Sequence, residues 1–556
     1  RYANFIQSKS NVTSGGLVSS NSGAVTATGL TSANVTNVTT GSGNDALTFS
    51  NIANTSTITT NAGNDTITVG GSTAASKTIT INAGDGADTL SIGANTLDLN
   101  NGTAFTLNSV ETIKMANGVT ALTVGRALLD GSTYILDHTT AGDSLVVTVE
   151  MGTGTSLNLA NMVVNTANLT VADRIDATGT ANADTLSGLD GMENRFDGGA
   201  GDDTITGGSV ADTLTGGDGA DNISGAAGGD TLIGSGGADT INGGDGDDNI
   251  TGGAGADTLT GGAGNDSYDY DAGSDVVSGE SIVEAASGGT DLINVDATTD
   301  FTNLSTSSLD EIEQIDVASG VTATFTGAQL TGETIELVAP GAGNAQAIVV
   351  NMAFDGTLDL SNFTANAAWT NTLAVAADED TITINGLGGA ETITGTAEND
   401  IVVLGAGDDT FKKPFGITSG YDTIQSGFTV GASNDVFDFT GTIDTTGGVT
   451  GYEAIATGTI NTATALVVCG TGMPAVTEAG LEDLFDATTS NLQAAAASDV
   501  FYFLGDNGGN SYLFHVALSA NNAEFTAADD VATLVATFTG IADCTTLVAA
   551  NFADFA

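Results

Sequence analysis

Between positions 198 and 269, eight aspartates recur at intervals of nine residues, each in the sixth place of a unit that opens with glycine. The units follow one another without insertion. Glycines, most often at the first, second and fourth places, permit backbone angles closed to other residues, so six residues can form a tight turn whose carbonyls point inward. Carboxylate and carbonyl oxygens are the ligands that Ca²⁺ prefers. The spacing therefore predicts calcium turns that use Asp203, Asp212, Asp221, Asp230, Asp239, Asp248, Asp257 and Asp266.

The last three residues of each unit are expected to form a short strand in which only the eighth side chain points into the core. Two turns and two strands make one coil of two units, so alternate aspartates share an edge. The predicted core is one side chain thick, with Ile205, Ile223, Ile241 and Leu259 on one sheet and Leu214, Leu232, Ile250 and Tyr268 on the other. It supplies about 1.5 to 3 kcal/mol per nine ordered residues, so cations must stabilise the fold as well.

The unit GGxGxDxUx resembles the nonapeptide of the RTX family of secreted calcium-binding proteins. We expect about six shared calcium sites between the eight units. Val210 replaces the fourth-place glycine, and Ala226 and Ser235 replace second-place glycines, which is expected to weaken individual sites. The alternative, a disordered Gly/Asp linker, is disfavoured by the unbroken register.

Three fragments near the N-terminus, GSGNDALT, NAGNDTIT and GDGADTLS, repeat the pattern of a glycine-containing turn that ends in aspartate. They contain Asp45, Asp65 and Asp88, which are separated by twenty and then by twenty-three positions. These spacings predict one calcium turn per coil, and plain Asp/Gly turns are the alternative.

A lead-in unit, GTANADTLS, contains Asp184, and residues 190–197 are interpreted as an interruption of the register before the main block. A weaker block, GLGGAETIT, GTAENDIVV and LGAGDDTFK, has its acids in the sixth place at Glu391, Asp400 and Asp409. Since Glu391 and Asp409 lie two units apart, we expect them to share an edge, with Asp400 opposite.

The chain is strongly acidic, with 68 acidic residues against 9 basic ones and a net charge of −59. This composition excludes nucleic acid as a direct partner unless divalent cations bridge the two surfaces. There is no apolar run long enough to predict a transmembrane segment. Cys469 and Cys544 could form a disulfide or remain two buried thiols. Because the chain starts at Arg1, we expect it to be processed or part of a longer protein.

We expect no enzymatic activity from this chain. The only histidines are His138 and His515, so an HExxH zinc motif is impossible, and no G-x-S-x-G motif occurs. In a chain with 68 acids, pairs of carboxylates arise by chance more often than they form a glycosidase site.

The predicted fold class is all-β: a calcium-binding parallel β-roll or β-solenoid flanked by further β-solenoid or β-sandwich-like modules, with one short helix at Leu481, Leu484 and Phe485. The segment LDEIEQIDVASG echoes NSVETIKMANG, which suggests duplicated β modules, and FYFLGDNGGNSYLFHVAL predicts a hairpin. The main roll is expected to lose its pattern at 270–277. The predicted divisions are an N-terminal arm at 1–23, a β domain at 24–178, the main roll at 179–284, a β module at 285–385, a second repeat block at 386–440 and a C-terminal β domain at 441–556.

Residues 386–556 look like the C-terminal region of RTX-type surface-layer proteins of Gram-negative bacteria. That resemblance implies an extracellular protein at the cell surface, exported by type I secretion through a C-terminal signal. Its expected partners are copies of itself and cell-surface polysaccharide bridged by calcium. The alternatives are a calcium-stiffened adhesin, or the repeat part of a secreted RTX enzyme.

Overall fold

The chain folds into two compact units in a computed structural model. Unit 1 comprises Arg1–Tyr268 with Val283–Gly289, and unit 2 comprises Asp269–Ile282 with Thr290–Ala556. The structure describes residues 17–18, 23–31, 37–51, 55–70, 78–93, 96–98, 104–116, 119–138, 144–165, 173–271, 276–284, 289–338, 346–352, 357–365, 381–387, 390–396, 400–405, 409–414, 422–426, 436–440, 452–454, 466–468, 500–506, 510–517 and 531–539.

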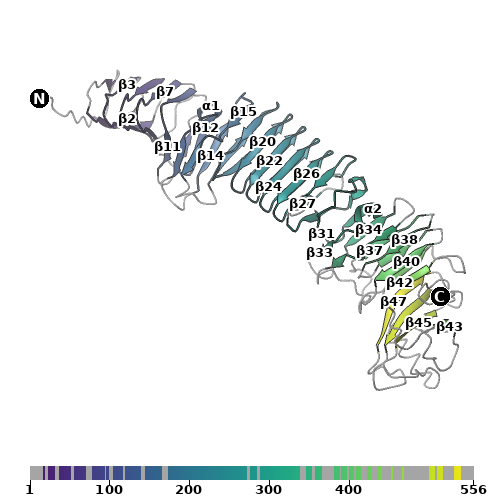
Figure 1. The fold of residues 1–556 in the computed structure, drawn as a ribbon. Coiled ribbons are helices and arrows are strands. Elements are labelled where there is room, and N and C mark those ends of the chain that lie inside the picture. The colour runs from purple at the N-terminus through teal and green to yellow at the C-terminus, as the bar shows by residue number, and fades with distance from the viewer. Residues whose placement is uncertain are drawn as a thin grey trace. The chain divides into compact units, whose positions relative to one another are not determined.

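Unit 1 begins as a parallel solenoid built from two sheets (Figure 1). One sheet has the order β1 (Leu17–Val18), β3 (Asn37–Thr39), β5 (Ser56–Thr59), β7 (Thr78–Asn82), β10 (Ala104–Asn108). The other has the order β2 (Thr26–Thr31), β4 (Ala46–Asn51), β6 (Thr66–Val69), β8 (Thr89–Ile92), β11 (Thr112–Met115), β13 (Ile135–His138), β16 (Val163–Asn165).

Where the nine-residue repeats begin, each coil shortens to two repeats. One sheet runs through β9 (Thr96–Asp98), β12 (Ala121–Gly125), β14 (Val146–Glu150), β17 (Arg174–Thr178), β19 (Glu193–Ala200), β21 (Thr213–Asp218), β23 (Thr231–Gly236), β25 (Asn249–Ala254) and β27 (Ser267–Tyr270). The other runs through β15 (Ser156–Asn158), β18 (Thr185–Ser187), β20 (Thr204–Gly208), β22 (Asn222–Ala227), β24 (Thr240–Asp245) and β26 (Thr258–Ala263).

The predicted core of the roll is confirmed. Ile205, Ile223, Ile241 and Leu259 are in register on one sheet, and Leu214, Leu232, Ile250 and Tyr268 on the other. All eight side chains are at most 1% exposed. The strands are longer than the three residues predicted, because hydrogen-bonded pairing continues into the next unit, as at Gly217 opposite Ser235 and Asp218 opposite Gly236.

The interpretation of residues 190–197 as an interruption is wrong. Residues 189–197 form one more nine-residue unit, in which Phe196 pairs with Leu214 and is 1% exposed. The sixth place of this unit holds Asn194 instead of aspartate. A single additional residue in the preceding coil, which separates Asp184 from Asp203 by 19 positions, obscures the register in the sequence.

Unit 2 is also a parallel solenoid over most of its described residues. One row of its strands is β29 (Leu292–Val295), β31 (Gln314–Val317), β33 (Glu336–Val338) and β36 (Thr364–Ala365). A second sheet has the order β35 (Thr357–Asp359), β38 (Thr392–Thr394), β40 (Thr410–Pro414), β42 (Val436–Thr440). A third has the order β30 (Thr299–Asp300), β32 (Thr322–Thr326), β34 (Ala347–Asn351), β37 (Thr381–Asn385), β39 (Asp400–Val403), β41 (Asp422–Ser426), β47 (Val531–Thr539), β46 (Asn510–Ala517), β45 (Val500–Asp506), β44 (Leu466–Val468), β43 (Tyr452–Ala454). The described residues from 290 to 440 therefore return to parallel coils and do not form the alternative β-sandwich. Two further elements are the 3₁₀ helix η2 (Phe301–Asn303) and β28 (Ser281–Val283).

The expected hairpin is confirmed as the antiparallel pair β45 and β46, and β47 adds a third antiparallel strand. The echoed segments also form the same elements. A strand pair followed by one helical turn occurs as β11, β12 and α1 (Arg126–Leu129) in unit 1, and as β31, β32 and α2 (Gly327–Leu330) in unit 2. None of the described helices is long or apolar enough to span a membrane. The predicted helix at Leu481, Cys469, Cys544 and most of the arm at 1–23 lie outside the described residues.

Candidate metal centre

The sixth-place aspartates form two ladders, one along each edge of the roll. Each carboxylate is buried, and its Oδ1 atom accepts a hydrogen bond from the backbone N–H of the aspartate one coil earlier. The donor–acceptor distances are 2.7 to 2.8 Å for the pairs 203–221, 212–230, 221–239, 230–248, 239–257 and 248–266. In each of these pairs, one carboxylate oxygen therefore connects successive coils, and the carboxylate has a second oxygen, Oδ2.

That second oxygen, Oδ2, has no donor within the described part of the chain in the middle of the roll. This holds for Asp203, Asp221, Asp230, Asp239 and Asp248. A buried carboxylate oxygen without a partner is destabilising, and a cation is the compensation that its charge favours.

The first-place glycines provide the space for these oxygens. A Cβ atom on Gly198 would collide with Oδ2 of Asp203 and would lie 2.6 Å from the carbonyl oxygen of Gly216. Gly234 and Gly243 have the same surroundings, with the carbonyls of Gly252 and Gly261 at 2.5 and 2.6 Å. A carboxylate and a carbonyl oxygen therefore converge beside each glycine, and oxygen ligands of these two kinds fit Ca²⁺.

The second-place residues of the eight units, except Gly208, adopt the left-handed conformation, even where glycine is replaced. Ala226 has φ 81° and Ser235 has φ 80°, close to the 95° of Gly253. The substitutions therefore leave the turn geometry intact and store strain in it. Their expected weakening of individual sites stays a prediction.

Burial raises the pKa of the ladder carboxyls from the ordinary value of 3.8. Desolvation is the largest cause, and it raises the pKa of Asp230, Asp239 and Asp248 to about 6, with a further contribution from the charges of neighbouring ladder aspartates. The pKa values of Asp203, Asp212 and Asp266 are also raised to about 6 by desolvation. In the absence of metal the ladder therefore favours protons, and calcium and protons compete for the same oxygens.

The N-terminal fragments form the single column that their spacing predicts. Oδ1 of Asp45, Asp65 and Asp88 accepts from the backbone N–H of Val25, Asp45 and Asp65 at 2.6, 2.7 and 2.8 Å. All three side chains are buried, and their Oδ2 atoms have no donor among the described residues. Desolvation raises the pKa of Asp45 and Asp88.

The weaker block shows the expected edges, and the lead-in unit joins one ladder of the main roll. The N–H of Asp184 donates to Asp203 at 2.7 Å, and that of Glu391 donates to Asp409 at 2.9 Å, so each of these pairs shares an edge. Asp400 begins a strand of the opposite sheet, as predicted. Its carboxylate accepts from the N–H and the hydroxyl of Thr396, both at 2.9 Å.

The structure adds ladder residues that the sequence analysis missed. Glu111 accepts from the N–H of Asp88, and Glu313 accepts from the N–H of Asp291, at 2.7 and 2.8 Å. Both glutamates belong to the echoed segments and directly precede a position where a strand begins, which is the signal that could have identified them. Glu284 lies two nine-residue units after Asp266 in the sequence, with carboxylate oxygens of the two residues within 4.8 Å of each other.

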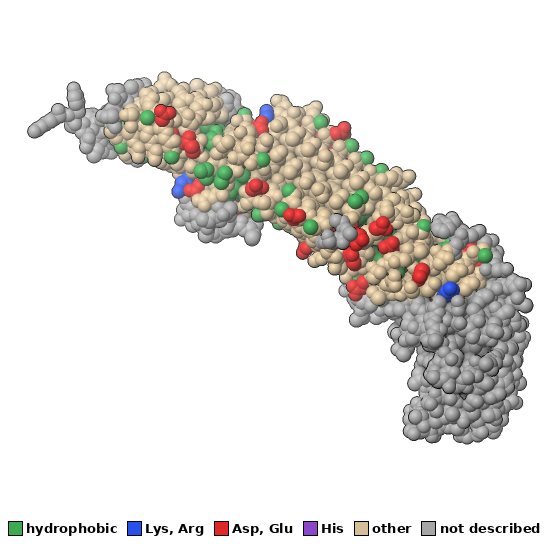
Figure 2. Space-filling model, in the orientation of Figure 1, with side chains coloured by type: hydrophobic (Ala, Val, Ile, Leu, Met, Phe, Trp, Pro, Cys, Tyr) green, Lys and Arg blue, Asp and Glu red, His purple; other side chains and the backbone are tan. Residues whose placement is uncertain are grey.

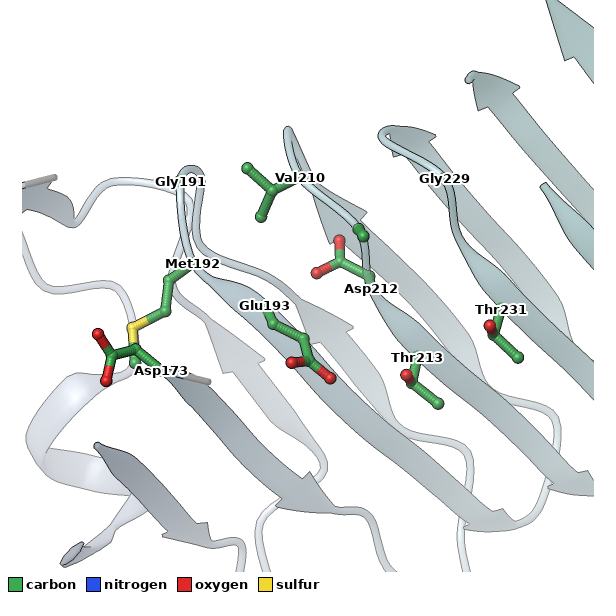
Figure 3. A pocket seen from close by; sticks show the side chains of 10 residues that line it. Asp173, Gly191, Met192, Glu193, Val210, Asp212, Thr213, Gly229 and Thr231 are labelled. Carbon is green, nitrogen blue, oxygen red and sulfur yellow. The ribbon is translucent and has the colours of Figure 1, made fainter. Parts of the chain in front are cut away.

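A shallow pocket lies beside the first turns of the roll (Figure 3). Figure 3 shows Glu193 and Asp212 at the start of the neighbouring strands β19 and β21, with Val210 in the turn before Asp212. Its lining residues are Asp173, Gly191, Met192, Glu193, Val210, Ala211, Asp212, Thr213, Gly229 and Thr231. Its acidic side chains are those of Asp173, Glu193 and Asp212.

Comparison with protein families matches the RTX calcium-binding nonapeptide repeat (4 copies) at residues 55–72, 178–214, 197–232, 215–249, 224–259, 242–277 and 385–411. No curated protein matches the chain. The matched segments contain the two ladders of the main roll, one N-terminal turn and the weaker block. Proteins with these repeats are typically secreted. The matched segments are thus RTX calcium-binding nonapeptide repeats folded as a β-roll; such repeats bind several calcium ions, and the buried aspartate ladders are consistent with that binding.

Proposed function

We propose that this protein is a non-enzymatic structural subunit that folds on calcium after export and assembles with copies of itself at the cell surface, as a layer, sheath or filament. The observation that carries the proposal is the pair of carboxylate ladders in a chain of net charge −59. Such a chain stays unfolded where calcium is scarce, can be exported in that state, and folds where calcium is plentiful.

The outer faces of the roll favour contacts through ions. Only Ile135, Val163, Val277, Val283 and Leu387 are exposed large hydrophobic residues in the described part of the chain. Figure 2 shows carboxylates on the visible face of the described residues and only isolated basic side chains. Two such surfaces repel each other unless counter-charge lies between them.

After calcium has filled the ladders, negative charge remains on the surface for bridging ions to bind. About ten ions would remove about twenty negative charges from each copy, so a large part of the −59 remains on the surface. Monovalent salt screens repulsion over about 8 to 10 Å but forms no bridge between carboxylates.

The test is electron microscopy and light scattering of the purified chain. Ordered arrays or filaments are expected in millimolar calcium; they should dissolve in chelator and not reform in sodium chloride of equal ionic strength. A variant with Asp218→Asn and Asp245→Asn, two exposed carboxylates outside the ladders, should keep the melting temperature and require more calcium to assemble. A monodisperse monomer at high concentration in saturating calcium would contradict self-assembly and favour an adhesin.

A further inference from the structure

Asn194 occupies a ladder position without a carboxylate. Its N–H donates to Oδ1 of Asp212 at 2.6 Å, which is the same bond that the aspartates make further along this edge. The residue is fully buried, and Gly188 and Gly208 leave the space for its amide, since a Cβ on either would lie within 3.0 Å of Nδ2. Asn194 is therefore part of the ladder and carries no charge.

The amide nitrogen of Asn194 is surrounded by oxygens of the kinds that ligate calcium. Nδ2 donates to the carbonyls of Leu189 and Met192 at 3.1 and 3.2 Å, and to Oδ1 of Asp212 at 2.9 Å. Its Oδ1 accepts from the N–H of Leu189 at 2.8 Å, and this bond fixes which side of the amide is nitrogen. Two turn carbonyls and a carboxylate of the next coil thus converge on an NH₂ group.

Both carboxylate oxygens of Asp212 already accept hydrogen bonds from protein N–H groups. Its Oδ1 accepts from Asn194, and its Oδ2 accepts from the N–H of Gly208 at 2.5 Å. Gly208 is the second-place residue of this turn and, unlike the second-place residues of the other seven units, it is not in the left-handed conformation. Protein N–H groups thus compensate here the carboxylate charge that a calcium ion would compensate in the regular turns.

The side-chain amide occurs on one edge of the roll. On the opposite edge, Oδ2 of Asp184 accepts from the N–H and the hydroxyl of Thr180, at 2.5 and 3.0 Å, and the ladder residues there are aspartates. Oδ1 of Asp184 and Oδ2 of Asp203 are buried and have no donor among the described residues. Asp230 is the first aspartate after Asp212 on the Asn194 edge, and its Oδ2 is likewise without a donor.

We propose that residues 189–212 form a metal-free lock, in which the side-chain amide of Asn194 takes the place of a calcium ion, and that the calcium-dependent part of the roll folds onto this preformed end. A neutral donor inside the ladder closes the turn without the repulsion that two facing carboxylates create. Addition of further coils to a coil that is already closed avoids a new nucleation step, as in other repeat folds.

The test is hydrogen exchange of the full chain, followed by mass spectrometry, in chelator and in calcium. In chelator, the amides of residues 189–212 should exchange at least about tenfold more slowly than those of residues 228–250, and calcium should remove the difference. Equal exchange of the two segments in chelator would overturn the proposal, and this comparison needs no variant.

Asn194→Asp restores the repeat consensus and tests the amide itself. The variant should lose the protection of 189–212 in chelator by about tenfold and regain it in calcium, because two facing carboxylates then need a cation. Asn222→Asp adds the same charge at an exposed position and should behave as the unmodified chain does. Retention of full protection by the Asn194→Asp variant in chelator would refute the role of the amide.

Discussion

Asp239 lies in the middle of one ladder, where its two oxygens have separable roles. Oδ1 accepts from the N–H of Asp221 at 2.8 Å, and Oδ2 is the atom without a donor among the described residues, beside Gly234. Asp239→Asn keeps the acceptor and removes the charge, whereas Asp239→Ala removes both. Asp245→Asn is the matched control, because Asp245 is exposed and outside the ladders.

The expected losses follow from these roles. At a calcium concentration 100 times the Kd, one ion contributes about 2.7 kcal/mol, so Asp239→Asn should lower the melting temperature by about 5 to 11 °C. Asp239→Ala also leaves the N–H of Asp221 without an acceptor, which should cost about 1 to 3 kcal/mol more. Asp245→Asn should change stability by less than about 0.5 kcal/mol.

Thermal denaturation in saturating calcium, followed by circular dichroism, measures all three variants. If the Asp239→Asn variant has the same melting temperature as the Asp245→Asn variant, Oδ2 of Asp239 holds no cation, and the assignment of the ladder as a calcium site fails. If the Asp239→Ala and Asp239→Asn variants have the same melting temperature, the hydrogen bond from Asp221 to Asp239 contributes nothing to stability.

Three further outcomes are expected. Ile241→Ala should cost about 2 to 5 kcal/mol in calcium, because the side chain is fully buried in a core one residue thick, whereas exposed Asn242→Ala should cost little; equal melting curves would contradict this. In chelator, stability should fall as pH rises from about 4 to above 6, because the folded ladder, with pKa values of about 6, binds more protons than the unfolded chain; circular dichroism that is constant over this range would refute it. Fusion of residues 475–556 to a passenger should permit type I export, and export that survives their deletion would exclude the signal.

The roll was predictable because the aspartates and the core residues recur with the same nine-residue period. Nine-residue spacing places Asp221 and Asp239 on one edge, and the same count puts Ile223 and Ile241 in the core, so register and burial follow together. The N-terminal column was predictable from Asp45, since the local turn sequence keeps its residue types even where the coil length varies.

The ladder residues that were missed depart from the residue type or from the count. Asn194 has a different side chain and follows a single additional residue, and Glu111 lies in a coil without a glycine turn. Each is defined by the backbone N–H to which it bonds, and that partner lies a full coil away in the sequence. Local sequence patterns do not contain such pairings.

Calcium on the ladder carboxylates is expected to make the roll fold. Far-ultraviolet circular dichroism of the chelated chain at pH 7, titrated with calcium at constant ionic strength, tests it most directly. A weak β signal is expected in chelator, with a cooperative gain as calcium is added and no gain when sodium replaces it. A chelated chain that keeps its full β signal and its melting temperature would contradict the account.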